Sequence, residues 1–378
     1  MEQKIEQTHI TYPFIHSGAD KTDVFFYKGI VDLSRAYSAD CAERRVFVTD
    51  ETIAALDSCK AFFESFGIKN AKRGDVKRKD GDTVVILGAG EKFKTIQSVL
   101  FIVQAALDAD CPRNTTFVGI GGGVITDMTA FAASIFKRGA KCEFVPTTLL
   151  AMVDAAVGGK SGCDFDNYKN MIGSFFPAKK LHVFPSFTHS LAQKEWKSGL
   201  AETIKTALLY SPALFEKLAS KPDILKNRTD PLVFEAIFEC VKAKGAVVER
   251  DFTEKNERMF LNLGHTFAHA LETCAGLGEV THGEAVAWGI ARAAALSSHL
   301  NIAEEHYESR VRTVLLDFGY EIEKRHSSLP KSISPRDLFL AMKKDKKNLS
   351  NGVRFVLQKK IGETIVREVD EADVLSVL

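Results

Sequence analysis

The chain has 378 residues, a length that suits two domains, and its 50 lysines and arginines nearly balance 49 aspartates and glutamates. A net charge of +1 argues against a broadly basic surface of the kind that binds nucleic acid or an anionic membrane. The first residues carry acids where a signal peptide would have a basic stretch before an apolar run, and no apolar run approaches the ~18–20 residues of a membrane helix, so we expect neither feature. Its seven cysteines are odd in number and never spaced CxxC, so we expect reduced thiols and a cytoplasmic protein.

Residues 1–190 are expected to form an α/β domain. Apolar segments with β-branched residues predict strands at 44–50, 82–90 and 115–123, and a helical pattern follows each of them, at 51–67, 94–111 and 124–139. Alternating strands and helices favour a parallel sheet with helices on both faces, as in Rossmann-like domains.

Residues 191–378 have a different pattern and are expected to form a second, mainly helical domain. The segment 352–369 reads as a β-hairpin, 325–337 as a loop, and the last residues as a closing helix. Helical spacing predicts five helices, at 195–210, 231–250, 257–276, 282–300 and 304–318.

A glycine-rich turn, "GIGGGVITD" (119–127), lies where the third predicted strand passes into a helix. Glycines let a ligand approach the backbone closely, and a helix N-terminus offers unpaired N–H groups to a pyrophosphate. The turn differs from the Rossmann fingerprint because Val124 occupies the third glycine position and no acid follows about 20 residues later. A simple tight turn therefore remains an alternative to a nucleotide site.

Further polar residues follow the predicted strands. Asp50 ends the first strand, and Glu91 and Lys94 follow the second. Thr147 and Thr148, in "VPTTLL" (145–150), lie at the end of the strand expected after the glycine turn and its helix. Open α/β sheets bind ligands at the carboxyl ends of their strands, so these residues are candidates for holding a dinucleotide. Each of them could instead be a helix cap.

Three histidines in 18 residues suggest a metal site. His265 and His269 are four residues apart in a helical pattern, which places them on one face, and His282 follows. Zinc and similar ions take imidazole together with carboxylate. Glu202, in a mostly apolar helical segment with Lys205 three residues later, is the candidate carboxylate, although the two could be a structural ion pair. Spacing favours His265 and His269 as ligands and leaves the other pairings open.

A series of blocks in this sequence resembles 3-dehydroquinate synthase, a family of NAD-dependent sugar phosphate cyclases. The blocks occur in family order between about residues 50 and 362. They are "GGGVITD", "VPTTLLAMVDAAVGGKSG", "KNMIGSF", "GLAETIK", "RMFLNLGHTFAHALE", "HGEAVAWG" and "MKKDKKNLSNGVRFVL". The resemblance implies NAD and one divalent metal, zinc or cobalt, as cofactors, and a homodimer.

The resemblance also implies roles for individual residues. It makes Glu202, His265 and His282 the metal ligands and places His269 near the substrate phosphate instead. The implied substrate-site residues are Lys160, Lys205, Asn262, His269, Arg258, Lys244, Asn170, Lys346 or Lys347, and Arg138 from the neighbouring subunit. The resemblance adds Asp154, Lys160 and Lys169 to the cofactor-binding candidates that positions after the strands suggest, which are Asp50, Glu91, Lys94, Gly122, Gly123, Val124, Asp127, Thr147 and Thr148.

The implied reaction converts 3-deoxy-D-arabino-heptulosonate 7-phosphate to 3-dehydroquinate and phosphate, a step of the shikimate route to aromatic amino acids. It proceeds by transient oxidation by NAD, elimination of phosphate and an intramolecular aldol. Two anionic groups on the substrate would account for the concentration of lysines and arginines among these residues in a chain of near-zero net charge. The alternatives are another sugar phosphate cyclase, a metal-dependent polyol dehydrogenase of the same fold, or a protein that has kept the fold without activity.

Overall fold

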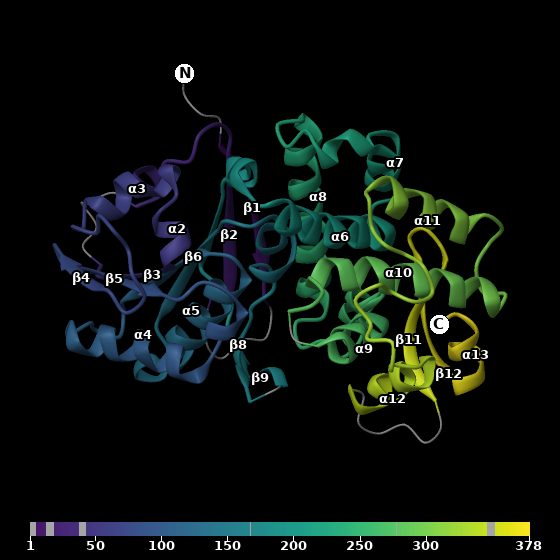
Figure 1. Cartoon of the computed structure of the whole chain (residues 1–378). Coiled ribbons are helices and arrows are strands. Elements are labelled where there is room, and N and C mark those ends of the chain that lie inside the picture. The colour runs from purple at the N-terminus through teal and green to yellow at the C-terminus, as the bar shows by residue number, and fades with distance from the viewer. Residues whose placement is uncertain (1–4, 13–18, 38–42, 167, 277, 346–351) are drawn as a thin grey trace. The chain divides into compact units, whose positions relative to one another are not determined.

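The structure of the protein is a computed structural model that describes all residues except 1–4, 13–18, 38–42, 167, 277 and 346–351 (Figure 1). The chain divides into two compact units. Unit 1 comprises Met1–Leu191 and Lys244–Thr253, and unit 2 comprises Ala192–Ala243 and Glu254–Leu378.

Unit 1 is built on an eight-stranded sheet with the order β1-β2-β10-β7-β6-β3-β5-β4. The six interior strands run parallel to one another, whereas the edge strands β1 and β4 are antiparallel to their neighbours. Every residue of β3, β5 and β6 is buried, as expected for a sheet covered on both faces. The strands are β1 (Ile5–Thr11), β2 (Lys21–Tyr27), β3 (Arg45–Asp50), β4 (Val76–Lys79), β5 (Asp82–Leu87), β6 (Thr116–Gly121), β7 (Lys141–Pro146) and β10 (Lys180–Val183).

Helices cover both faces of this sheet. Figure 1 shows α2 (Glu51–Ala54) and α3 (Asp57–Glu64) on one side of it, and α4 (Ile96–Asp108) and α5 (Gly123–Ile135) on the other. From β3 the chain continues to β5, toward the β4 edge of the sheet. It then crosses back over β3 to β6 and β7, toward the β1 edge. Because parallel connections are right-handed, this reversal places the later helices on the opposite face. The reversal makes the carboxyl ends of β3 and β6 the expected ligand-binding edge.

The remaining elements of unit 1 are short. An antiparallel hairpin, β8 (Lys160–Phe165) and β9 (Tyr168–Phe175), packs beside α5 and α4. Its Asp164 amide donates a hydrogen bond of 2.8 Å to the carbonyl of Lys94, which anchors the hairpin next to the segment after β5. The other elements are α1 (Leu33–Ala36), the 3₁₀ turns Glu91–Phe93, Phe136–Arg138 and Pro185–Ser190, and a π-helical turn at Ala151–Ala155.

Unit 2 is a bundle of helices around α10, with a two-stranded hairpin packed beside it. Helix α10 is buried along nearly its whole length because α6, α9, α11 and β11 all contact it. The helices are α6 (Gln193–Tyr210), α7 (Pro212–Ser220), α9 (His265–Ala275), α10 (His282–His299), α11 (Tyr307–Asp317), α12 (Pro335–Asp345) and α13 (Glu371–Ser376), and the hairpin consists of β11 (Val353–Lys360) and β12 (Glu363–Val369). Two 3₁₀ turns, Pro222–Leu225 and Glu257–Asn262, also belong to unit 2. Most of α8 (Pro231–Arg250) lies in unit 2, but its last residues, from Lys244 on, belong to unit 1.

The expected fold class, a parallel α/β domain with a mainly helical region after it, is confirmed. Two of the predicted helices are interrupted. The segment 51–67 contains α2 and α3, which are separated at Leu56, where the backbone is extended. The segment 257–276 contains a 3₁₀ turn and then α9, because Gly264 adopts a left-handed conformation that a continuing helix does not allow. None of the helices in the described part of the chain is long and apolar enough to cross a bilayer.

Candidate active site

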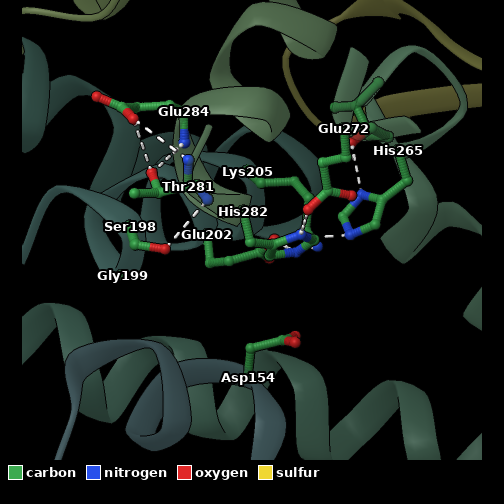
Figure 2. Close-up of polar contacts among 12 residues, drawn as sticks. Asp154, Ser198, Gly199, Glu202, Lys205, His265, Glu272, Thr281, His282 and Glu284 are labelled. Atoms are coloured by element: carbon green, nitrogen blue, oxygen red, sulfur yellow. Dashed lines mark hydrogen bonds and ion pairs between the residues drawn. The ribbon is translucent and has the colours of Figure 1, made fainter. Parts of the chain in front are cut away.

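Three helices of unit 2 bring one carboxylate and two imidazoles together. Glu202 lies in the middle of α6, His265 opens α9 and His282 opens α10 (Figure 2). The Oε1 atom of Glu202 is 3.6 Å from Nε2 of His265 and 3.5 Å from Nε2 of His282. One ligand atom from each residue can be chosen so that all three lie within 4.8 Å of one another. In the described residues, no other group of at least three His, Cys, Asp or Glu side chains meets this spacing.

Close contacts between backbones hold these helices in place. A Cβ atom on Gly283 would lie 2.2 Å from the Cα and 2.4 Å from the carbonyl oxygen of Ser198, so α10 can approach α6 only with glycine here. The Gly283 amide also donates a 3.1 Å hydrogen bond to Oγ of Ser198. On α9, Gly264 has φ +80° and lies against α10, where a Cβ on Gly289 would be 2.1 Å from the Gly264 oxygen. These contacts place the first residues of α9 and α10 opposite Glu202.

The electrostatics of this group are dominated by burial. Glu202 is fully buried, and Lys205 on the next turn of α6 forms an ion pair with its other oxygen, Oε2. Burial, then the positive charge of Lys205, holds the pKa of His265 well below its usual value. Burial also lowers the pKa of His282, but interactions with the carboxylates of Glu202 and Glu272 outweigh it and raise that pKa to about 9.

The group has the properties of a divalent-cation site. Oε1 of Glu202 is buried and makes no geometrically acceptable hydrogen bond, although two imidazole nitrogens face it. Ligands that lie about 2.0–2.2 Å from a tetrahedral ion are roughly 3.3–3.6 Å apart, which matches the two measured separations. The Nδ1 atoms point away from the group: that of His265 is 3.3 Å from the Leu263 carbonyl and that of His282 is 3.4 Å from Oε1 of Glu272. One carboxylate and two imidazoles therefore fit zinc or a similar ion.

The remaining candidates of unit 2 lie close to this group in the chain. Asn262 directly precedes the break before α9 and donates a 2.8 Å hydrogen bond to Oε1 of Glu254. Arg258, in the 3₁₀ turn, is 1% exposed. His269 lies one turn after His265, with ring centroids 5.6 Å apart and the rings nearly perpendicular, and it does not belong to the three-residue group.

Unit 1 brings several of the candidate residues into two polar clusters. Lys94 donates hydrogen bonds of 2.7 Å to Oδ2 of Asp127 and 2.5 Å to Oδ1 of Asn170. Burial lowers the pKa of Lys94, but Asp127 and other acids outweigh it, so the lysine stays charged. Lys244 donates to both Oδ1 and the carbonyl of Asp154, each at 2.7 Å. Lys94 thus joins the segments after β5 and β6 to the β8–β9 hairpin, and Lys244 of α8 binds Asp154 in the segment after β7.

Other candidates of unit 1 lie at the carboxyl ends of the strands. Oδ1 of Asp50 accepts from the amides of Thr52 and Ile53, so the helix-cap reading of Asp50 holds, and burial raises its pKa. Thr147 directly follows β7, and Thr148 accepts from the amide of Ala151 as a cap. Gly122 precedes α5 and Gly123 and Val124 begin it, whereas Glu91, Arg138, Lys160 and Lys169 are exposed. Lys346 and Lys347 lie outside the described residues.

Comparison with known proteins gives a consistent result along the chain. The family model for the 3-dehydroquinate synthase N-terminal region matches residues 84–198, and the C-terminal model matches 199–348. The 3-dehydroquinate synthase of Xanthomonas campestris pv. campestris is 37% identical over 300 residues, which cover 78% of this chain and 80% of the relative. That of Nitrosospira multiformis is 34% identical over 334 residues, with 88% and 87% covered. The chain belongs to the 3-dehydroquinate synthase family.

Solved structures with the same fold include two synthases and a dehydrogenase. A 2-deoxy-scyllo-inosose synthase complexed with carbaglucose-6-phosphate, NAD⁺ and Co²⁺ superposes with a TM-score of 0.81 at 22% identity, covering 98% of this chain and 99% of that one. The 2-epi-5-epi-valiolone synthase from Streptomyces hygroscopicus subsp. jinggangensis, with NAD⁺ and Zn²⁺ bound, also gives 0.81, at 24% identity with 97% and 98% covered. A glycerol dehydrogenase from Schizosaccharomyces pombe gives 0.63 at 13% identity, with 97% and 90% covered. At these identities the likeness shows the fold alone.

Sequence reasoning missed Glu272. This residue lies seven positions after His265, two turns along α9, and its carboxylate lies next to His282. A residue at this spacing shares a helix face with His265, so the signal was present in the sequence. It was not used because nothing in the sequence shows that α10 packs on that face.

Proposed function

We propose that this member of the 3-dehydroquinate synthase family converts 3-deoxy-D-arabino-heptulosonate 7-phosphate to 3-dehydroquinate and phosphate, with NAD and one divalent metal. The observation that carries the proposal is the group formed by Glu202, His265 and His282, together with the family match over residues 84–348. We assign NAD binding to residues 1–190 and metal binding, with most of the substrate contacts, to residues 191–378. A cytoplasmic location is supported by the six cysteines of the described residues, which form no disulfide with one another.

In this proposal Glu202, His265 and His282 hold the metal. When bound, the ion supplies Lewis acidity to substrate hydroxyls and NAD accepts and returns a hydride. Glu202 contributes through Oε1, because Lys205 is paired with Oε2 and keeps that oxygen turned away from the imidazoles. Burial keeps His265 neutral and therefore ready to coordinate.

The anionic substrate is bound by cationic and amide side chains. Arg258 and Lys244 hold the carboxylate, Lys205 and Asn262 hold hydroxyl groups, and His269 donates near the phosphate. Arg258 and Lys244 are 1% and 7% exposed, and a cation shielded from water binds an anion more strongly than a surface cation does. The remaining substrate-site residues are Lys160, Asn170, Lys347 and Arg138 of the partner subunit.

The cofactor is bound by the carboxyl ends of the strands of unit 1. The N-terminus of α5, opened by Gly122, Gly123 and Val124, receives the pyrophosphate, because its first amides have no partner within the helix. Asp50 contacts the ribose from the end of β3, the strand next to β6. The other cofactor-binding residues are Glu91, Lys94, Asp127, Thr147, Thr148, Asp154, Lys160 and Lys169.

We further propose a homodimer in which Arg138 is supplied to the neighbouring site. Arg138 is exposed and lies in a turn where both it and Lys137 have positive φ, at +63° and +47°. Such a backbone conformation is uncommon outside glycine and costs free energy, so we infer that this turn has a functional role. Sedimentation of the purified protein tests the dimer, and an active monomer would contradict it.

The experiment for the activity uses the protein with the heptulosonate phosphate, NAD and zinc or cobalt. We expect stoichiometric release of phosphate and formation of 3-dehydroquinate, without lasting accumulation of NADH. The same fold occurs in a 2-deoxy-scyllo-inosose synthase and a glycerol dehydrogenase, so their substrate types serve as comparisons. Phosphate release from a hexose 6-phosphate alone would indicate another cyclase. NADH accumulation on simple polyols would indicate a dehydrogenase.

A further inference from the structure

Each proposed metal ligand has a second interaction on the side away from the ion. Lys205 pairs with the second oxygen of Glu202, and the carbonyl of Leu263 faces Nδ1 of His265 at 3.3 Å. The partner of His282 differs from that of His265 because it is a carboxylate: Oε1 of Glu272 lies 3.4 Å from Nδ1 (Figure 2). The Glu272 side chain is 14% exposed, so its charge is largely shielded from water.

This geometry fixes how His282 presents its other nitrogen. An acceptor beside Nδ1 holds the proton there and leaves the lone pair on Nε2, the atom that is 3.5 Å from Glu202. Carboxylates in this position also increase the basicity of a ligating imidazole. A carbonyl, as at His265, orients the ring but brings no net charge.

The charges of the site give Glu272 a second effect. Glu202 and Lys205 form a pair with no net charge, and a coordinating histidine is neutral. Glu272 places a further carboxylate beside His282, close to the position of a divalent cation held by this group. The attraction acts over a short distance through a mostly buried region, where it is stronger than in water.

We propose that Glu272 is a positioning residue that orients His282 and raises the affinity of the Glu202–His265–His282 group for a divalent metal. The inference rests on the proposed metal-binding function. Helix α9 then contributes to the metal site twice. Its first residue, His265, is a ligand, and Glu272, two turns later, orients the ligand His282 of α10. Removal of such an outer partner typically lowers metal affinity about 10–100-fold.

The test compares four proteins: the wild type, Glu272→Ala, Glu272→Gln and the control Glu279→Gln. Glutamine keeps an acceptor for Nδ1 and the shape of the side chain but removes the charge. Glu279 is exposed and lies in the loop between α9 and α10, so its substitution makes the same charge change at a solvent-exposed position. Zinc affinity is measured by competition with a chromophoric chelator, the ligand field by the visible spectrum of Co²⁺, and metal-free stability by thermal unfolding.

We expect Glu272→Ala to lose about 10–100-fold in zinc affinity. We expect Glu272→Gln to lie between Glu272→Ala and the wild type, and Glu279→Gln to match the wild type. The Co²⁺ spectrum should change in Glu272→Ala, whereas the melting temperature of the metal-free protein should stay within a few degrees. Affinity and spectrum like those of the wild type in Glu272→Ala would overturn the inference. So would an affinity loss that follows an equal fall in metal-free stability, because Glu272 would then be a packing residue.

The design separates this inference from the proposed function. If the wild type binds no zinc, or if His265→Ala binds it as tightly as the wild type does, the metal site itself is wrong. If His265→Ala abolishes binding while both Glu272 variants bind normally, only the role of Glu272 is wrong.

Discussion

The contact between Gly283 and Ser198 leads to a prediction about both stability and metal binding. In Gly283→Ala the new Cβ would be 2.2 Å from the Cα of Ser198, whereas ordinary van der Waals contact begins at 3.4 Å. The helices must therefore separate locally by about 1.2 Å, the difference between these distances. The new Cβ is fixed to the backbone of α10 and meets backbone atoms of Ser198, so no rotation of a side chain relieves the clash.

The expected cost has two parts. Overpacking of a tight contact costs about 1–3 kcal/mol, and weakening the 3.1 Å hydrogen bond from the Gly283 amide to Ser198 adds about 1 kcal/mol. We therefore expect Gly283→Ala to lower the free energy of unfolding by about 2–4 kcal/mol. Because His282 is the preceding residue, the same displacement moves its Nε2 away from Glu202, and a shift of this size exceeds the ~0.5 Å tolerance of a functional site.

The assay is urea unfolding of the metal-free protein together with zinc competition against a chelator. Arg292→Met is the matched control: Arg292 lies on the same helix and donates to the carbonyls of Ile322 and Val377 at 2.6 and 2.8 Å. Its loss should destabilise the protein by a similar amount but leave zinc affinity unchanged. A Gly283→Ala protein with wild-type stability and zinc affinity would refute the packing argument. Equal loss of affinity in both variants would show that general destabilisation is the cause.

Three further outcomes follow from the described contacts. Lys205→Met leaves the buried charge of Glu202 unpaired, so unfolding of the metal-free protein should become easier by about 3–5 kcal/mol, and zinc should restore part of the loss. His282→Ala should lose zinc in metal analysis, whereas His269→Ala should keep zinc and lose turnover; equal loss would contradict the ligand assignment. Burial raises the pKa of Tyr27 to about 12 in the folded protein. The protonated phenol therefore contributes to stability in full below pH 10, and this contribution is lost between pH 10 and 12. Tyr27→Phe should show a shallower decline of unfolding free energy over that pH range.

The parts of the fold that could be predicted are those with regular apolar spacing. Strands β3, β5 and β6 are buried on both faces and therefore appear as apolar runs, and their positions are confirmed. The hairpin of β8 and β9 gave no such signal, because most of β9 is exposed. The break at Gly264 was also not predictable, since a glycine inside a helical pattern is compatible with a continuing helix.

The ligand set of the candidate metal group could not be predicted from residue spacing alone. His265 and His269 do share a helix face, with ring centroids 5.6 Å apart, so the geometric premise was correct. Whether two such nitrogens converge on one point depends on what the neighbouring helices place opposite them. Here α6 places Glu202 and α10 places His282 opposite His265, and both placements depend on glycine contacts with backbone atoms. The sequence shows the glycines but not which surface each one faces, so the set had to come from family resemblance.

The proposed metal and nucleotide ligands belong to different units, and this separation can be tested directly. Glu202, His265 and His282 are in unit 2, whereas Asp50, the N-terminus of α5 and Lys94 are in unit 1. A ligand that binds only the folded state stabilises the region that forms its site, by about 2.7 kcal/mol at 100 times the dissociation constant. In hydrogen exchange, zinc alone should therefore protect the first turns of α9 and α10 and the middle of α6, and NAD alone should protect the ends of β3 and β6. Protection of β6 and α5 by zinc, with none in α9, would place the metal elsewhere, and the assignment of the two units would have to be abandoned.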